Sequence, residues 1–198
     1  VGFVYFFSQH PITNLDDLKQ RRIWLWQGDA LGAAMFRAGE LAPVPLSITD
    51  VFTSLSTVLI DTVYCTPIAA IALQCFTKTP YIVDLPMTNG IGALVVSNRF
   101  YDGLPPDLQK LLAETGRETG ERLIAATRID NEKSLEVLEQ EGLTFVMDPA
   151  ATDPQELTDM RDRAAADLIA SGYIPRPLYE RTWTLLEQFR AGQAARTP

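Results

Sequence analysis

Apolar and polar positions follow two different periods along the first half of the chain. Short runs rich in β-branched and aromatic residues predict strands, and segments with apolar residues three and four positions apart predict helices between them. The strands are expected at residues 1–7, 22–26, 43–46, 61–66, 81–85 and 91–96. The helices are expected at residues 14–20, 29–38, 50–59 and 68–76. Asn14 and Thr49 are the expected N-caps of two of these helices. The alternation predicts an α/β fold with a mainly parallel, helix-covered sheet.

The second half of the chain is mostly helical in pattern. Leucines recur at helical spacing from Pro106 to about Glu141 without an internal proline, which predicts a single helix about 50 Å long. A strand is expected at residues 143–147, and further helices at 154–170 and 177–191. We therefore divide the chain into an α/β lobe, residues 1–96, and a region, residues 97–198, that contains a return strand, a long connecting helix and C-terminal helices.

Composition and charge exclude several function classes. The 198 residues include 17 Lys and Arg against 25 Asp and Glu, a net charge of -8, which argues against a nucleic-acid partner. With one His and two Cys, the chain lacks the ligands for the common zinc sites, and we expect no metal and no cofactor. No nucleotide-binding glycine motif or nucleophile–base pair is evident, so we predict that the chain is not an enzyme.

Two cysteines, Cys65 and Cys75, lie ten positions apart. Both are expected to be buried thiols, and in an oxidising compartment a disulfide between them is the alternative. The apolar runs at residues 68–76 and 91–96 are each shorter than the roughly 20 residues that span a bilayer. The sequence also begins without Met or a basic leader segment, and we expect its natural start to be missing.

Several short motifs and their spacing are similar to one known family. The segment Pro11–Lys19, the run Pro43–Leu46 ahead of Asp50-Val51-Phe52, Asp61, and the segments Leu94–Asn98 and Leu104–Gln109 carry the similarity. Together they resemble the periplasmic substrate-binding proteins of tripartite ATP-independent (TRAP) transporters, the DctP family. The resemblance covers about residues 1–148.

This resemblance implies a two-lobed clamshell of the periplasmic-binding-protein type. Such a protein closes on a small ligand in the cleft between its lobes and delivers it to TRAP membrane subunits, with no bond made or broken. Family members are longer, so the chain resembles only the second lobe, the long connecting helix and the C-terminal helices. If the first lobe is truly absent, we expect the exposed cleft face to be covered by a homodimer partner or by another chain.

The resemblance also assigns residues of the ligand pocket. Family members grip an organic acid with an arginine, and Trp24 stands at its position. A second arginine of some members corresponds to Val4, an aromatic contact to Ile48, and an asparagine to Cys65. A carboxylate placed among such apolar groups loses hydration without gaining ionic partners.

The pocket is therefore expected to bind a hydrophobic or weakly polar ligand. Trp24 and Trp26, on the same side of one strand, offer flat rigid surfaces, while Tyr64 and Gln27 supply hydrogen bonds. Three alternatives stay open. The chain could bind an organic acid through backbone N–H groups and another arginine, serve as a structural or signalling lobe whose tryptophans are simply packed, or be a cytosolic α/β enzyme.

Overall fold

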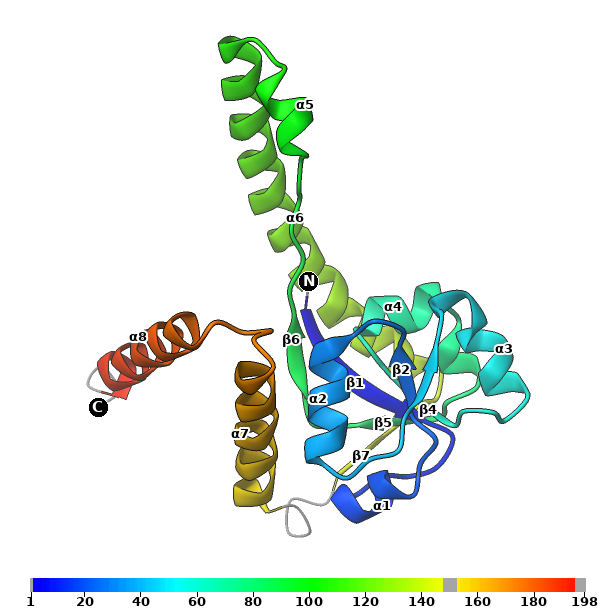
Figure 1. Ribbon diagram of the computed structural model, residues 1–198. Coiled ribbons are helices and arrows are strands. Elements are labelled where there is room, and N and C mark those ends of the chain that lie inside the picture. The colour runs from blue at the N-terminus through cyan, green and yellow to red at the C-terminus, as the bar shows by residue number, and fades with distance from the viewer. Residues whose placement is uncertain (1, 148–152, 195–198) are drawn as a thin grey trace.

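The computed structural model describes residues 2–147 and 153–194, shown in Figure 1. The strands are β1 (Gly2–Ser8), β2 (Trp24–Trp26), β3 (Val44–Leu46), β4 (Thr62–Cys65), β5 (Tyr81–Val83), β6 (Thr88–Gly90) and β7 (Thr144–Val146). The α-helices are α1 (Leu15–Lys19), α2 (Ala30–Ala38), α3 (Val51–Ser56), α4 (Pro67–Ala72), α5 (Asn98–Asp102), α6 (Pro106–Gln140), α7 (Pro154–Ala170) and α8 (Arg176–Ala194). Two short 3-10 helices are η1 (Ile48–Asp50) and η2 (Cys75–Thr77).

The main sheet is built around β1, which corrects the expected strand directions. Its order is β4-β1-β5-β7, with β6 also paired to β1, and β1 is antiparallel to β4, β5 and β6. The β5–β7 and β2–β3 pairs are parallel, and a parallel bridge between Ile23 and Thr62 connects β2 to the main sheet. The sheet is therefore mixed rather than mainly parallel. Hydrophobic periodicity identifies a strand but carries no information on its direction, so the pattern of the sequence does not distinguish a mixed sheet from a parallel one.

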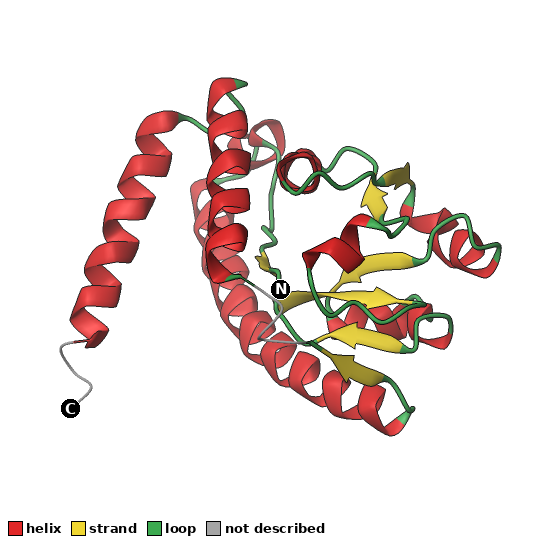
Figure 2. Cartoon of the chain, turned by 90° about the horizontal axis from the view of Figure 1, so that it is seen from below, coloured by secondary structure: helices red, strands yellow, loops and turns green. Residues whose placement is uncertain are grey.

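The core occupies both faces of the main sheet. Successive side chains of a strand point to opposite faces, so Phe6 and Phe7 of β1 anchor different clusters. Phe7 packs with residues of α3, α4 and α6, including Leu55, Ala70 and Leu138. Phe6 packs on the other face with Leu18 of α1, Phe36 of α2 and neighbouring residues. Helices thus cover both faces of the sheet (Figure 2).

The 35-residue helix α6 confirms the long helix expected from the leucine spacing. Its C-terminal part packs on the lobe through Asn131, Ser134 and Leu138, whereas its N-terminal part extends away from the sheet with α5 beside it (Figure 1). Apolar side chains on the extended part, such as Leu111 and Leu123, are exposed. The apolar stripe of this helix is therefore only partly covered by the described residues.

The C-terminal helices begin close to where the sequence places them. Helix α7 begins at Pro154 after its N-cap Asp153 and packs against α2, and α8 begins at Arg176. Strand β7 also lies beyond residue 96, yet it pairs with β5 in the main sheet. Both β7 and α7 thus pack on the lobe that precedes residue 96. The division of the chain at that residue stays a prediction. Among the described residues, no helix is both long enough and apolar enough to cross a bilayer.

Two local predictions are wrong. Residues 91–97 adopt no regular secondary structure, and Ile91 is 90% exposed, because no strand edge among the described residues pairs with this segment. Thr49 lies inside η1 and hydrogen bonds to Ser47 instead of capping α3. The expected cap at Asn14 is confirmed, since its side chain accepts a hydrogen bond from the Asp17 backbone N–H.

Candidate functional site

Three aromatic side chains of β2 and β4 lie together. The rings of Trp24 and Trp26 are stacked with centroids 6.3 Å apart, and the ring of Tyr64 lies 5.5 Å from Trp24. We call these three residues the aromatic group. Parallel alignment of β2 with β3 and the bridge to β4 bring the residues together from separate parts of the chain.

The two tryptophans have different environments. Trp24 is 3% exposed, and its indole Nε1–H donates a hydrogen bond of 3.0 Å to the backbone oxygen of Leu46 on β3. Trp26 is 52% exposed. Consequently, Trp24 anchors the stack within the core, and the indole of Trp26 is the part of the stack that solvent or a ligand reaches.

Tyr64 is held by a contact that the sequence did not reveal. Its hydroxyl donates to Asp29 Oδ2 at 2.6 Å and accepts from the Trp26 backbone N–H at 3.3 Å. The other Asp29 oxygen accepts from the Gly32 N–H and caps α2. Burial, followed by the hydrogen bond to Asp29, raises the pKa of Tyr64 well above its ordinary value. The position of Asp29 ahead of a small-residue helix is a sequence signal for an N-cap. Its contact with Tyr64 has no such signal, because it depends on the fold.

The remaining predicted ligand contacts differ in their burial and in their place in the fold. Gln27 is exposed and its backbone N–H donates to Leu46 O at 3.2 Å, while Ile48 at the start of η1 is 36% exposed. Cys65 is half-buried and packs in the same core cluster as Trp24. Val4 is buried and lies opposite Thr88 in the β1–β6 ladder. The structure therefore brings Trp24, Trp26 and Tyr64 into direct contact and places Val4 on a different strand pair.

Both cysteines are free thiols. Burial raises the pKa of Cys65 well above its ordinary value and that of Cys75 to about 11. Both side chains are therefore protonated at neutral pH, in keeping with the expectation of buried thiols.

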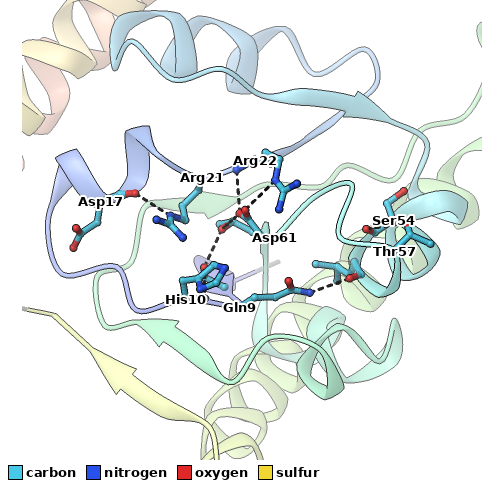
Figure 3. Close-up of polar contacts among 11 residues, drawn as sticks. Gln9, His10, Asp17, Arg21, Arg22, Ser54, Thr57 and Asp61 are labelled. Atoms are coloured by element: carbon cyan, nitrogen blue, oxygen red, sulfur yellow. Dashed lines mark hydrogen bonds and ion pairs between the residues drawn. The ribbon is translucent and has the colours of Figure 1, made fainter.

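The two arginines near β2 lie at its other end, away from Trp26. Arg22 donates from its backbone N–H and from Nε to the buried carboxylate of Asp61, at 3.0 and 3.2 Å, and Arg21 Nε donates to the backbone oxygen of Asp17 (Figure 3). His10 and Gln9 lie in the same polar region. These hydrogen bonds stabilise the loop between β1 and β2. Both arginines therefore have structural partners away from the aromatic group.

A hollow lies between the start of β1, β6 and α6. Its volume is about 480 Å³, within the range of about 300–1,000 Å³ that suits small ligands. Tyr5, Asn89 and Arg128 are among the residues that line it. Among the described residues, no group of three or more His, Cys, Asp or Glu side chains is positioned to hold a metal ion.

Comparison with known proteins places this geometry in context. Residues 1–168 match the family model described as bacterial extracellular solute-binding protein, family 7 (DctP). The C4-dicarboxylate-binding periplasmic protein DctP of Rhodobacter capsulatus is 24% identical over 179 residues, which cover 86% of this chain and 53% of that protein. A solute-binding protein of Sulfitobacter sp. is 25% identical over 113 residues, 57% of this chain and 34% of the relative.

Solved structures share the fold at low sequence identity. A TRAP periplasmic solute-binding protein from Desulfovibrio desulfuricans with bound sn-glycerol-3-phosphate has a TM-score of 0.81 at 17% identity, covering 96% of this chain and 59% of that one. One from Roseobacter denitrificans with bound β-D-glucuronate has a TM-score of 0.80 at 14% identity, covering 90% and 58%. The chain thus spans between about a third and three-fifths of the length of these relatives. With its first 168 residues matched, the chain belongs to the DctP family of bacterial extracellular solute-binding proteins.

Proposed function

We propose that this chain supplies one ligand-facing wall of a TRAP-type extracytoplasmic solute-binding protein whose ligand is hydrophobic or weakly polar. In this proposal, the ligand packs against Trp26 when the two lobes close, and the loaded protein delivers it to the membrane subunits. The exposed indole of Trp26, stacked on the buried indole of Trp24, is the observation that supports it most directly.

The family itself consists of periplasmic solute-binding proteins, which agrees with the predictions of a binding protein rather than an enzyme and of a periplasmic location. The relatives named above carry or are named for anionic ligands, namely a C4-dicarboxylate, sn-glycerol-3-phosphate and β-D-glucuronate. Those ligands belong to those proteins. The choice of ligand for this chain has to come from its own side chains.

Charge near the aromatic group argues against an anion at Trp26. The Asp29 carboxylate is hydrogen bonded to Tyr64, whose hydroxyl also accepts from the Trp26 backbone. Arg22, close in sequence, is instead paired with Asp61 at the far end of β2. An acid beside Trp26 would lose hydration next to a carboxylate, whereas an apolar or aromatic group gains contact with a rigid indole face.

Mass spectrometry of the full natural gene product, first native and then after organic extraction, tests this proposal. We expect a retained apolar or aromatic compound. Tryptophan fluorescence then locates its site in a background in which every tryptophan other than Trp24 and Trp26, Trp183 among them, is replaced by Phe. The extracted compound should change this fluorescence, and Trp26→Ala should weaken its binding at least tenfold while Trp183→Phe leaves it unchanged.

A different result would overturn the proposal. If no ligand is retained and no hydrophobic compound raises the melting temperature, the tryptophans are packing residues of a lobe without a ligand. Size-exclusion chromatography of the same sample then tests the alternative that the lobe serves as an interaction surface, because a homodimer or a bound partner chain would elute earlier than a monomer.

A second candidate function is binding of an organic acid in the hollow beside α6. Arg128 lines this hollow together with Asn89 and Tyr5, and a guanidinium is the side chain best suited to a carboxylate. A thermal shift with C4-dicarboxylates or uronates that disappears in Arg128→Gln, but persists in Trp26→Ala, would favour this function over the apolar ligand. Arg117→Gln, on the same helix but outside the lining of this hollow, is the matched control.

A further inference from the structure

A second, smaller cavity lies on the opposite face of β1 from the large hollow. It is bordered by α1, α2 and α7 and by the ends of the neighbouring strands, it opens to solvent beside the exposed residues Asp153 and Glu156, and its volume is about 70 Å³ (Figure 1 shows these elements). Phe6 of β1 and Phe36 of α2 form part of its wall. Their rings are stacked with centroids 6.4 Å apart. The cavity is thus bounded by well-packed rings on one side.

All four methionines of the chain line this cavity. Met35 lies on α2, Met87 follows β5, Met147 follows β7 and Met160 lies on α7, so the fold gathers them from four separate segments. Methionine is unbranched, flexible and polarizable, so a wall made of it can adapt its shape to a guest. A wall with this composition can therefore close around apolar groups of different shapes.

Polar groups at the edge of the cavity already have partners within the protein. The backbone N–H and hydroxyl of Thr13 both donate to the Asp17 carboxylate, and the Asn14 side chain accepts from the Asp17 N–H. Asp153 accepts from the Gln155 backbone, and Glu156 lies 3.9 Å from the Lys19 ammonium. The rest of the lining is mostly apolar, and a buried water needs two to four polar partners, so the interior of the cavity favours an apolar occupant over water.

We propose that this cavity is a second binding site, for a small apolar group such as a short alkyl chain. Its volume is about half of the ~150 Å³ apolar cavity that takes up benzene or xenon, so xenon or a chain of a few carbons fits without rearrangement. The site does not depend on the proposed ligand at Trp26. The two sites are in contact through one ring pair, because the ring of Phe36, which lines the cavity, stands edge-on to Tyr64 with centroids 5.5 Å apart.

The methionines themselves provide the test. The full chain is labelled with ¹³C in the methionine methyl groups, and xenon pressure is raised while the ¹H–¹³C spectrum is recorded. The methyl signals assigned to Met35, Met87, Met147 and Met160 each report on the cavity. We expect all four signals to shift along saturable curves with one common dissociation constant, and the same response in Trp26→Ala.

Filling the cavity should remove this response. Leu157→Phe adds a ring from the α7 wall, and Val83→Ile adds one methylene from β5 with less risk to folding. Xenon affinity should fall at least tenfold in Leu157→Phe and by a smaller factor in Val83→Ile, with circular dichroism confirming that each variant is folded. Signals that do not shift, shifts that stay linear with pressure, or shifts unchanged in both folded variants would overturn the proposal. The Trp26→Ala measurement keeps this outcome separate from any failure at the aromatic group.

Discussion

Substituting the two stacked tryptophans separately should show that Trp24 mainly stabilises the fold and that Trp26 mainly contacts the ligand. Trp24 is 3% exposed, so Trp24→Ala removes a fully buried ring, which costs about 3–5 kcal/mol of unfolding free energy. Trp26 is 52% exposed and has about half as much buried area to lose, so Trp26→Ala should cost about 2 kcal/mol. Stability and ligand affinity should therefore respond in opposite order, with Trp24→Ala costing more stability and Trp26→Ala more affinity.

A third variant, Trp24→Phe, isolates the indole hydrogen bond. The ring is kept, but the Nε1–H donor to Leu46 O is lost. That carbonyl also accepts from the Gln27 N–H at 3.2 Å, so it keeps a partner. The lost bond should then cost only about 1 kcal/mol, without the larger penalty of an unpaired buried acceptor.

Urea unfolding followed by far-UV circular dichroism is the appropriate assay, because the substituted residues are themselves the main fluorophores of the lobe. Equal slopes of unfolding free energy against urea would show that the variants expose similar surface on unfolding. If Trp26→Ala destabilises as much as Trp24→Ala, the indole of Trp26 is buried in solution and the reasoning that makes it a ligand contact is refuted.

Three further predictions concern charges and thiols in the same lobe. Hydrogen bonds from the preceding loop lower the pKa of Asp17 in the folded protein. Its contribution to stability is therefore complete above about pH 4, the pKa of the unfolded state, and is lost as the pH falls through the lower folded value. In Asp17→Asn, the melting temperature should depend less on pH over this acid range. Asp61→Ala removes the acceptor of the Arg22 backbone N–H and of the buried Thr62 hydroxyl, and it should cost about 2–3 kcal/mol in urea unfolding. The Arg22 side chain is half-exposed, so Arg22→Ala should cost no more than about 1 kcal/mol, and equal losses would contradict this asymmetry. Because burial raises the pKa of Cys65 and Cys75, Ellman's reagent at pH 8 should label them only after unfolding, and rapid labelling of the native protein would show that they are accessible thiolates.

The amino-acid pattern by itself determined the local elements of this protein. The leucine spacing after Pro106 predicted the long helix, and the side chain of Asn14 predicted a cap, because helix formation and capping depend on residues a few positions apart. The same local reasoning failed at residues 91–96, where an apolar, β-branched run meets no partner edge among the described residues and forms no strand. Family motifs were also readable, because they are short and fixed in spacing.

Tertiary structure alone decided how these elements combine. Only the sheet reveals that β1 runs antiparallel to its three partners, because strand direction is set by long-range pairing. Trp24 and Trp26 are expected on the same side of one strand, yet packing buries the first and exposes the second. The bond from Tyr64 to Asp29 and the gathering of the methionines at one cavity likewise join residues far apart in the chain. Burial and contact depend on which surfaces meet in the fold, and no local pattern of residue types encodes that information.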